Sequence, residues 1–247
     1  MPSVVLIGGG FIGLEVAAAL NARGCIVTVV EKATCLLPRV RCDAVSAVVL
    51  EHHRRAGIDV RVGTEVVSGG DDYVLLDDGG RVDADFIVAG IGIVPEAQIA
   101  TSAGLEVDDG IVVYECCRTS DPDIFAAGDV SRGNHLLLRT SVRLESWQNA
   151  NIQAQAVANA ILNAAPAEPE TPWAWSDQGE LNVQVAGAPS NIDRVFIRRD
   201  PDNPDALTAP QIFQSKLVGA CTVNNGKDMA IIRRLLAGGG ELGLFAE

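Results

Sequence analysis

Three glycines near the start of the chain have the spacing of a phosphate-binding turn. Gly8, Gly10 and Gly13 match G-x-G-x-x-G, and an apolar run, residues 4–7, precedes them. In this motif the first glycine permits a tight turn, the second lets a pyrophosphate approach the backbone, and the third lets helix and strand pack closely. The free N–H groups at the start of the following helix attract the phosphates. The chemistry predicted here is the binding of a dinucleotide.

A carboxylate further along indicates which dinucleotide is bound. Glu31 lies 23 positions after Gly8, at the end of the next apolar run. A carboxylate there accepts hydrogen bonds from the ribose hydroxyls of the adenosine and repels a 2'-phosphate, so we expect NADH rather than NADPH. Arg39 follows at a distance from which it can reach phosphate or ribose, so the preference is expected to be moderate. The alternative is that Glu31 merely ends a strand at the surface.

The elements that must position these residues follow a βαβαβ order. Continuous β-branched and aliphatic runs are typical of strands buried on both faces of a parallel sheet, and they occur at residues 4–7, 26–30 and 59–62. Apolar spacing predicts one helix around Gly13 and a second that begins at Asp43 and ends before Gly57. The apolar stripe of the second helix is predicted to include His52.

The pattern changes after the third strand. Closely spaced turn residues over 64–85 predict an antiparallel meander, and residues 86–89 predict another buried strand. Two short strands then lead to Gly128 and Asp129, and a helix is expected over residues 145–163. The Pro-containing stretch 164–172 is typical of a linker, and a small α+β unit is predicted beyond it.

Composition excludes several classes of function. The chain has 247 residues, and its 19 Lys and Arg against 32 Asp and Glu give a net charge of −13, which argues against a nucleic-acid partner. The most apolar stretch is interrupted by glycines and a glutamate and falls short of a bilayer span, so no membrane association and a cytoplasmic location are expected. The six cysteines lack metal-binding spacing, so no metal site is predicted.

Seven stretches identify a family resemblance: VVLIGGGFIGLEVAAAL, VVEKATCLLPR, VAGIGIVPE, TSDPDIFAAGDV, RLESWQNANIQAQAVA, PWAWSDQGELNVQVAG and VNNGKDMAIIRRLL. In this order and spacing, the chain resembles the FAD-dependent ferredoxin reductases of bacterial oxygenase systems over nearly its whole length. The resemblance implies NADH and FAD as cofactors and a [2Fe-2S] ferredoxin as partner. In that family NADH reduces the flavin by hydride transfer, and the flavin passes single electrons to the ferredoxin.

The resemblance also implies an α/β fold with three domains. A Rossmann-type NADH domain of the glutathione-reductase kind, including the β-meander, would occupy residues 1–97. Residues 98–165 would form the returning part of an FAD domain, which would be incomplete here. Residues 166–247 would form the small α+β reductase domain that covers the flavin.

Individual site residues follow from the same motifs. The residues expected at the NADH are Gly8, Gly10, Phe11, Ile12, Gly13, Glu31, Lys32, Arg39, Ile91 and Gly92. Around the flavin, Asp129 would accept a hydrogen bond from the ribityl chain, Trp147 would lie against the isoalloxazine, and Trp175 would wall the site. Glu15 is predicted to be catalytic, near where nicotinamide meets flavin, and to pair with a lysine of the FAD half. The alternative for Glu15 is an ordinary first-turn glutamate favoured by the helix dipole.

The chain departs from the family at its start. Family members carry their own G-x-G-x-x-G for the ADP half of FAD more than a hundred residues before the NADH domain, whereas this sequence begins three residues before the NADH strand. We therefore expect the primary FAD site to be missing and Glu15 to be solvated or paired anew. The predicted function is that of the NADH:ferredoxin reductase component in a form inactive alone. The alternatives are a flavin-free NADH-binding module and a remnant whose apolar surface on residues 98–165 is covered by self-association.

Overall fold

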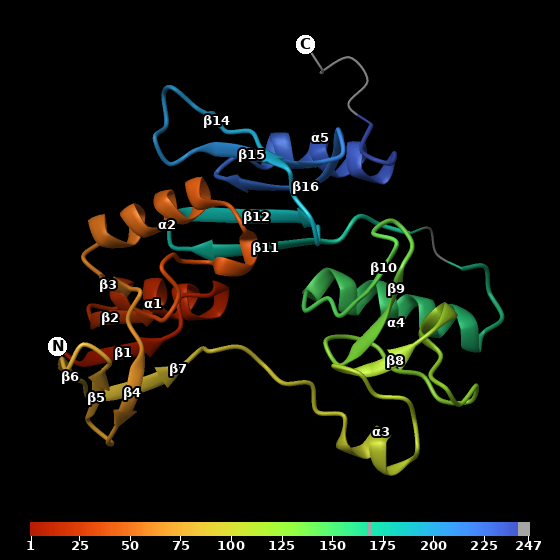
Figure 1. The fold of residues 1–247 in the computed structure, drawn as a ribbon, viewed down its shortest axis with the longest axis horizontal. Coiled ribbons are helices and arrows are strands. Elements are labelled where there is room, and N and C mark those ends of the chain that lie inside the picture. Colours follow the sequence, from red (N-terminus) through yellow and green to blue (C-terminus); the bar gives the residue numbers. More distant parts are fainter. Residues whose placement is uncertain (167–168, 242–247) are drawn as a thin grey trace.

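The computed structural model describes residues 1–166 and 169–241, which form three units. The first unit spans residues 3–89, the middle unit residues 98–161 and the last unit residues 173–237 (Figure 1). Within the described ranges, none of the helices combines the length and apolar character that crossing a bilayer requires.

The first unit is built on a parallel sheet of order β3-β2-β1-β7. Its strands are β1 (Ser3–Ile7), β2 (Ile26–Glu31), β3 (Asp59–Val62) and β7 (Phe86–Ala89). The helices are α1 (Phe11–Ala22), α2 (Asp43–Arg55) and a single 3-10 turn, η1 (Pro38–Val40). The predicted parallel α/β arrangement is therefore confirmed. The central strands are apolar without alternation because both of their faces are covered.

The predicted meander is also present and covers one face of that sheet. It consists of β4 (Val66–Gly69), β5 (Tyr73–Leu76) and β6 (Arg81–Asp83), paired in the order β4-β5-β6. Val74 and Leu76 of β5 pack against Val5 and Val30 of the parallel sheet. The other face of the parallel sheet is left to α1 and α2.

The middle unit has a small core of its own. Its elements are α3 (Gln98–Ser102), β8 (Ile111–Val113), the 3-10 turn η2 (Glu115–Cys117), β9 (Ser131–His135), β10 (Thr140–Val142) and α4 (Trp147–Ile161). The segment between β7 and α3 crosses to this unit as an extended chain (Figure 1). The predicted helix over 145–163 is present, but its apolar side is exposed: Trp147 is 71% and Ile161 61% accessible, whereas Gln148 and Asn149 are buried.

The last unit is an antiparallel sheet with one helix. Its strands are β11 (Trp173–Gln178), β12 (Leu181–Gly187), β13 (Arg194–Val195), β14 (Arg198–Arg199), β15 (Leu207–Phe213) and β16 (Lys216–Val223), and its helix is α5 (Gly226–Ala237). Strand β15 was not predicted individually, and it contains Pro210, a residue that is unusual inside a sheet. In the structure this proline faces Ala220 of β16 within a seven-residue strand.

The first and last units share one hydrophobic core. Leu14 of α1 and Val45 and Val49 of α2 pack in the same cluster as Val183 and Leu207 of the last unit's sheet. The opposite face of that sheet packs on α5, where Met229 and Ile232 are buried. The last unit's sheet is therefore sandwiched between the helices of the first unit and its own helix.

This shared core corrects the predicted position of the packed histidine. His53, rather than His52, is buried, with 1% of its surface accessible. His52 stays at the rim, where its Nδ1 lies 3.5 Å from Oδ2 of Asp205 in the last unit. Because α2 is covered both by its own sheet and by the last unit, its buried surface is wider than one apolar stripe.

We expect His53 to make stability depend on pH. Burial lowers the pKa of His53 below its ordinary value of 6.5, and the Gln178 hydrogen bond offsets only part of this effect. The imidazole therefore takes up a proton at higher pH in the unfolded chain than in the folded chain. The contribution of neutral His53 to the free energy of unfolding is complete above about pH 6.5, and it is lost as the pH falls toward the folded-state pKa. Urea unfolding at about pH 7.5 and about pH 5.5 should show a smaller loss for His53→Gln than for the wild type. Equal losses would contradict this prediction.

Candidate functional site

The glycine loop lies at the carboxyl ends of β1 and β7. A Cβ added to Gly13 would lie 2.2 Å from the carbonyl oxygen of Gly8, and one added to Gly8 would lie 2.4 Å from that of Gly90. These two glycines are therefore required by the packing of strand, loop and helix. In contrast, a Cβ on Gly10 meets no atom of the described residues within 4 Å. Gly10 is the N-cap of α1 and has no side chain, so the first-turn N–H groups remain open to an anionic ligand.

Glu31 braces this loop. Its Oε2 accepts a hydrogen bond of 2.6 Å from the N–H of Gly9, and its Oε1 accepts one of 2.7 Å from the N–H of Ala33. An ionised carboxylate has about four acceptor positions, so about two remain for ribose hydroxyls. The strand-end position of Glu31 was predicted from the sequence, but its contact with the glycine loop was not.

The other residues predicted at the NADH differ in their surroundings. Phe11 packs against the shared core, whereas Ile12 and Ile91 are exposed, by 68% and 78%, beside the glycine loop. Gly92 follows Ile91 in a left-handed conformation, with φ of 103°. Lys32 is engaged elsewhere, because its Nζ lies 2.8 Å from Oε1 of Glu65 before the meander.

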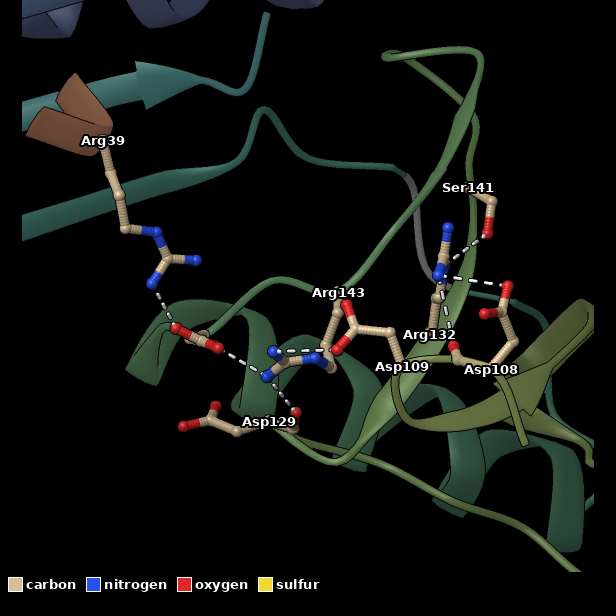
Figure 2. A network of polar contacts seen from close by, with 8 residues as sticks. Arg39, Asp108, Asp109, Asp129, Arg132, Ser141 and Arg143 are labelled. Atoms are coloured by element: carbon tan, nitrogen blue, oxygen red, sulfur yellow. Dashed lines mark hydrogen bonds and ion pairs between the residues drawn. The ribbon is translucent and has the colours of Figure 1, made fainter. Parts of the chain in front are cut away.

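Arg39 reaches across to the middle unit. Its Nη1 donates to Oε2 of Glu145 over 2.7 Å, and Arg143 donates to the other oxygen of the same carboxylate (Figure 2). Burial alone would raise the pKa of Glu145, but the hydrogen bonds and charges of Arg39 and Arg143 outweigh it and lower that pKa. Glu145 is therefore a stable anion, and it pairs with Arg39 near the start of α4.

Asp129 lies in the same network, but its carboxylate takes no part in it. Only its backbone oxygen accepts a hydrogen bond, from Arg143, and the carboxylate is directed away from that arginine (Figure 2). The residue is exposed, and its side chain has no hydrogen-bond partner in the described part of the chain. Asp129 is therefore an available acceptor.

Strand β11 connects Glu15 with Trp147 and Trp175 where the three units meet, with Glu15 on one face of the strand and the two tryptophans on the other. The rings of Trp147 and Trp175 lie 5.9 Å apart in an edge-to-face arrangement. Ser176, next to Trp175 on β11, donates a hydrogen bond of 2.6 Å to Oε1 of Glu15. We call this cluster of Glu15, Trp147, Trp175 and Ser176 the junction. It contains the predicted catalytic residue and both tryptophans predicted at the flavin.

Further contacts hold the junction together. Trp173 stacks on Trp175 with ring centroids 4.7 Å apart, and its backbone N–H donates to Oε1 of Gln148 at the start of α4 over 2.8 Å. Glu15 is thus paired anew, with Ser176, and its second oxygen has no hydrogen bond or ion pair within residues 1–166 and 169–241.

Sequence reasoning missed Ser176, Gln148 and Glu145. All three lie inside stretches that carried the family resemblance, within two positions of residues that were singled out. Strand alternation contains a usable signal for Ser176, because it places this side chain on the face of β11 opposite Trp175. The partner on that face could not be predicted, since Glu15 is 161 positions away.

Comparison with known proteins places this site in a family. Residues 1–154 match the family described as pyridine nucleotide-disulphide oxidoreductase, and residues 173–244 match a family described as reductase C-terminal. The ferredoxin--NAD(+) reductase component of the anthranilate 1,2-dioxygenase system of Burkholderia cepacia is 40% identical over 241 residues, which cover 96% of this chain and 59% of that protein. Putidaredoxin reductase of Pseudomonas putida is 41% identical over 209 residues, which cover 82% of this chain and 50% of that protein.

A solved structure agrees with these relatives. The crystal structure of a covalent putidaredoxin reductase–putidaredoxin complex superposes with a TM-score of 0.91 at 36% identity, covering 96% of this chain and 58% of the matched one. The chain thus spans between half and three fifths of the length of the relatives it matches. The first family match covers 154 of 247 residues and includes the glycine loop, Glu31 and the start of α4. The chain therefore belongs to the pyridine nucleotide-disulphide oxidoreductase family.

Proposed function

We propose that this chain carries the NADH-binding part of an NADH-dependent ferredoxin reductase and one wall of its flavin site. The junction is the observation that supports this proposal, because β11 connects Glu15, on the helix that begins at the glycine loop, with Trp175 and, through it, with Trp147 of the middle unit. The relatives named above are reductase components that serve a dioxygenase or putidaredoxin. In the proposed function, electrons pass from NADH through a flavin to a [2Fe-2S] ferredoxin of an oxygenase system.

The proposed NADH site runs from the glycine loop toward the junction. The pyrophosphate would lie on the N–H groups at the start of α1, and the adenosine ribose would donate to the free acceptor positions of Glu31. The negative charge of Glu31 would oppose a 2'-phosphate. Glu15 is four residues beyond Phe11 on α1, about one helical turn, and the family resemblance puts the nicotinamide beside it.

The described residues fit only part of an FAD molecule. Asp129 offers a free carboxylate for the ribityl chain, and Trp147, 71% exposed, offers a ring face for the isoalloxazine. Residues 1–166 and 169–241 contain no second G-x-G-x-x-G between a strand and a helix to receive the FAD pyrophosphate. We therefore propose that FAD binding needs the additional region that the longer relatives have. The corresponding domain limits would be 1–97, 98–165 and 166–247.

A second candidate function is a self-associated NADH-binding module. The observation that favours it is a series of exposed apolar side chains from β7 to α3 and from the start of α4 to the residue after its end: Phe86, Ile91, Ile93, Val94, Ile99, Trp147, Ile161 and Leu162. Exposed apolar surface of this kind marks contacts with other protein surfaces. A second copy of the chain would cover it in this candidate, and the additional FAD region would cover it in the first.

Two glycine variants separate nucleotide binding from folding. Gly10→Ala should leave the free energy of unfolding within about 0.5 kcal/mol of the wild type, because its Cβ enters open space, yet weaken NADH binding at least about tenfold by blocking the pyrophosphate. Gly13→Ala should destabilise the fold by about 2 kcal/mol or more through its clash with Gly8. Urea unfolding and calorimetric titration measure the two effects. Unchanged NADH affinity in a folded Gly10→Ala protein would contradict the proposed site.

Glu31 should control the choice between NADH and NADPH. Glu31→Gln removes the charge that opposes a 2'-phosphate while retaining the side-chain size, so the preference for NADH should fall by about tenfold. NADH itself should bind more weakly, since the amide group turns a donor toward Gly9 or Ala33. Calorimetric titrations with both nucleotides measure this ratio, and Glu180→Gln, which removes the charge of an exposed glutamate in the last unit, is the matched control. A ratio unaltered by Glu31→Gln would show that this carboxylate does not face the ribose.

Flavin retention and mass distinguish the two candidate functions. After incubation with FAD and removal of free flavin by gel filtration, the chain should show no flavin absorbance, because it offers only the ribityl and ring contacts. Retention of one flavin per chain would contradict this expectation. Light scattering on the same sample should give the mass of one chain for the first candidate and a multiple of it for the self-associated module.

A further inference from the structure

A series of buried hydrogen bonds runs through the core shared by the first and last units. His53 Nε2 lies 2.9 Å from Oε1 of Gln178, and Gln178 Nε2 donates to Oγ of Ser176 over 3.0 Å. Ser176 Oγ in turn donates to Oε1 of Glu15 over 2.6 Å. We call these four residues the polar relay. His53 is 1% exposed, and Gln178 and Ser176 are fully buried.

The charge at one end sets the direction of every hydrogen bond in the polar relay. An ionised Glu15 only accepts, so the Ser176 hydroxyl must donate to it. That hydroxyl can then accept from the amide N–H₂ of Gln178, which leaves the amide oxygen facing the imidazole. His53 must therefore carry its proton on Nε2, and burial, which lowers the pKa of His53, favours this neutral form. All of these donors consequently point toward Glu15, an arrangement that strengthens each bond.

The surroundings indicate that this arrangement serves Glu15 rather than packing. The relay lies in the core that contains Leu14, Val49 and Leu181, where polar groups are costly unless fully paired. Apolar side chains would fill the same space at lower cost. On β11, strand alternation directs Ser176 and Gln178 into this core while Trp175 faces the other way, toward Trp147. Strand β11 thus supplies Trp175 on one face and, on the other, the Ser176 and Gln178 side chains that support the Glu15 carboxylate.

We propose that Ser176, Gln178 and His53 are positioning residues that hold Oε1 of Glu15 and leave its Oε2 free to face the nicotinamide. This inference rests on the proposed function, in which the nicotinamide lies beside Glu15. A fixed carboxylate stabilises the positively charged ring of NAD⁺ more than the neutral ring of NADH. The last unit therefore tunes the ratio of the two affinities without contacting the nucleotide through these residues.

Calorimetric titrations of the whole chain with NAD⁺ and NADH test this role. Glu15→Gln should raise the ratio of the NAD⁺ to the NADH dissociation constant by about tenfold, and Ser176→Ala should raise it by about threefold. Gln178→Leu should act in the same direction as Ser176→Ala. The double variant of Glu15→Gln with Ser176→Ala should show no more than the Glu15→Gln effect, because the serine acts through the carboxylate.

Thr222→Val is the matched control. Thr222 lies fully buried on β16 of the same sheet, and its hydroxyl has no hydrogen-bond partner in the described part of the chain. Its removal should leave the ratio unchanged. The positioning role is overturned if Ser176→Ala leaves the ratio unaltered while Glu15→Gln shifts it, or if the two effects add in full.

A second measurement does not depend on the nucleotide. The Nε2 proton of His53 should give a slowly exchanging NMR resonance, assigned by its loss in His53→Gln. Glu15→Gln, made three hydrogen bonds away, should shift this resonance, and Thr222→Val should not. If the wild type binds neither nucleotide, the proposed function is refuted but the polar relay is not. If Glu15→Gln leaves the His53 resonance unshifted, the polar relay is refuted whether or not the nucleotides bind.

Discussion

The packing of the last unit's sheet against α1 and α2 is the contact on which the rest of the structure depends. It buries apolar side chains from both units in one cluster, which includes Leu14, Val49 and Leu207. Arg41 adds hydrogen bonds to the carbonyl oxygens of Pro189 and Ser190, and Arg55 adds an ion pair with Asp205. Since α1 also begins at the glycine loop, this packing fixes the loop relative to β11 and hence Glu15 relative to Trp175.

The middle unit is held in a different way. Its own core is small and consists mainly of alanines and short strands, and no described core cluster joins it to its neighbours. Arg39 and Glu145 connect it to the first unit, but the Arg39 side chain is 76% exposed, and such surface ion pairs contribute about 0–1 kcal/mol. Gln148 and the edge-to-face contact of Trp147 with Trp175 connect it to β11. The position of Trp147 therefore depends on the last unit more than on the residues that precede it in the chain.

The features that sequence predicted well are those decided locally. The individual buried strands, the meander and the role of Gly13 in packing follow from patterns within about 30 residues, whereas the close approach of Gly8 to Gly90 joins residues 82 positions apart. The burial of His53, the pairing of Glu15 with Ser176 and the contact between Arg39 and Glu145 each need a partner more than 100 positions away. Periodicity describes one face of one element, so it cannot show which of two neighbouring histidines a distant sheet will cover.

The two carboxylates near the glycine loop differ in how their charge is held, and this difference bears on the proposed binding of a dinucleotide by an acidic chain. With a net charge of −13, long-range electrostatics oppose an anionic ligand, so phosphate binding must come from the N–H groups of α1 at short range. Glu31 has both oxygens on backbone N–H groups, which disperses its charge into the loop that it braces. Glu15 has only one oxygen engaged, by a hydroxyl from another unit. In the proposed function, the first carboxylate thus shapes the phosphate and ribose end, and the second keeps an uncommitted charge at the end where the nicotinamide would lie.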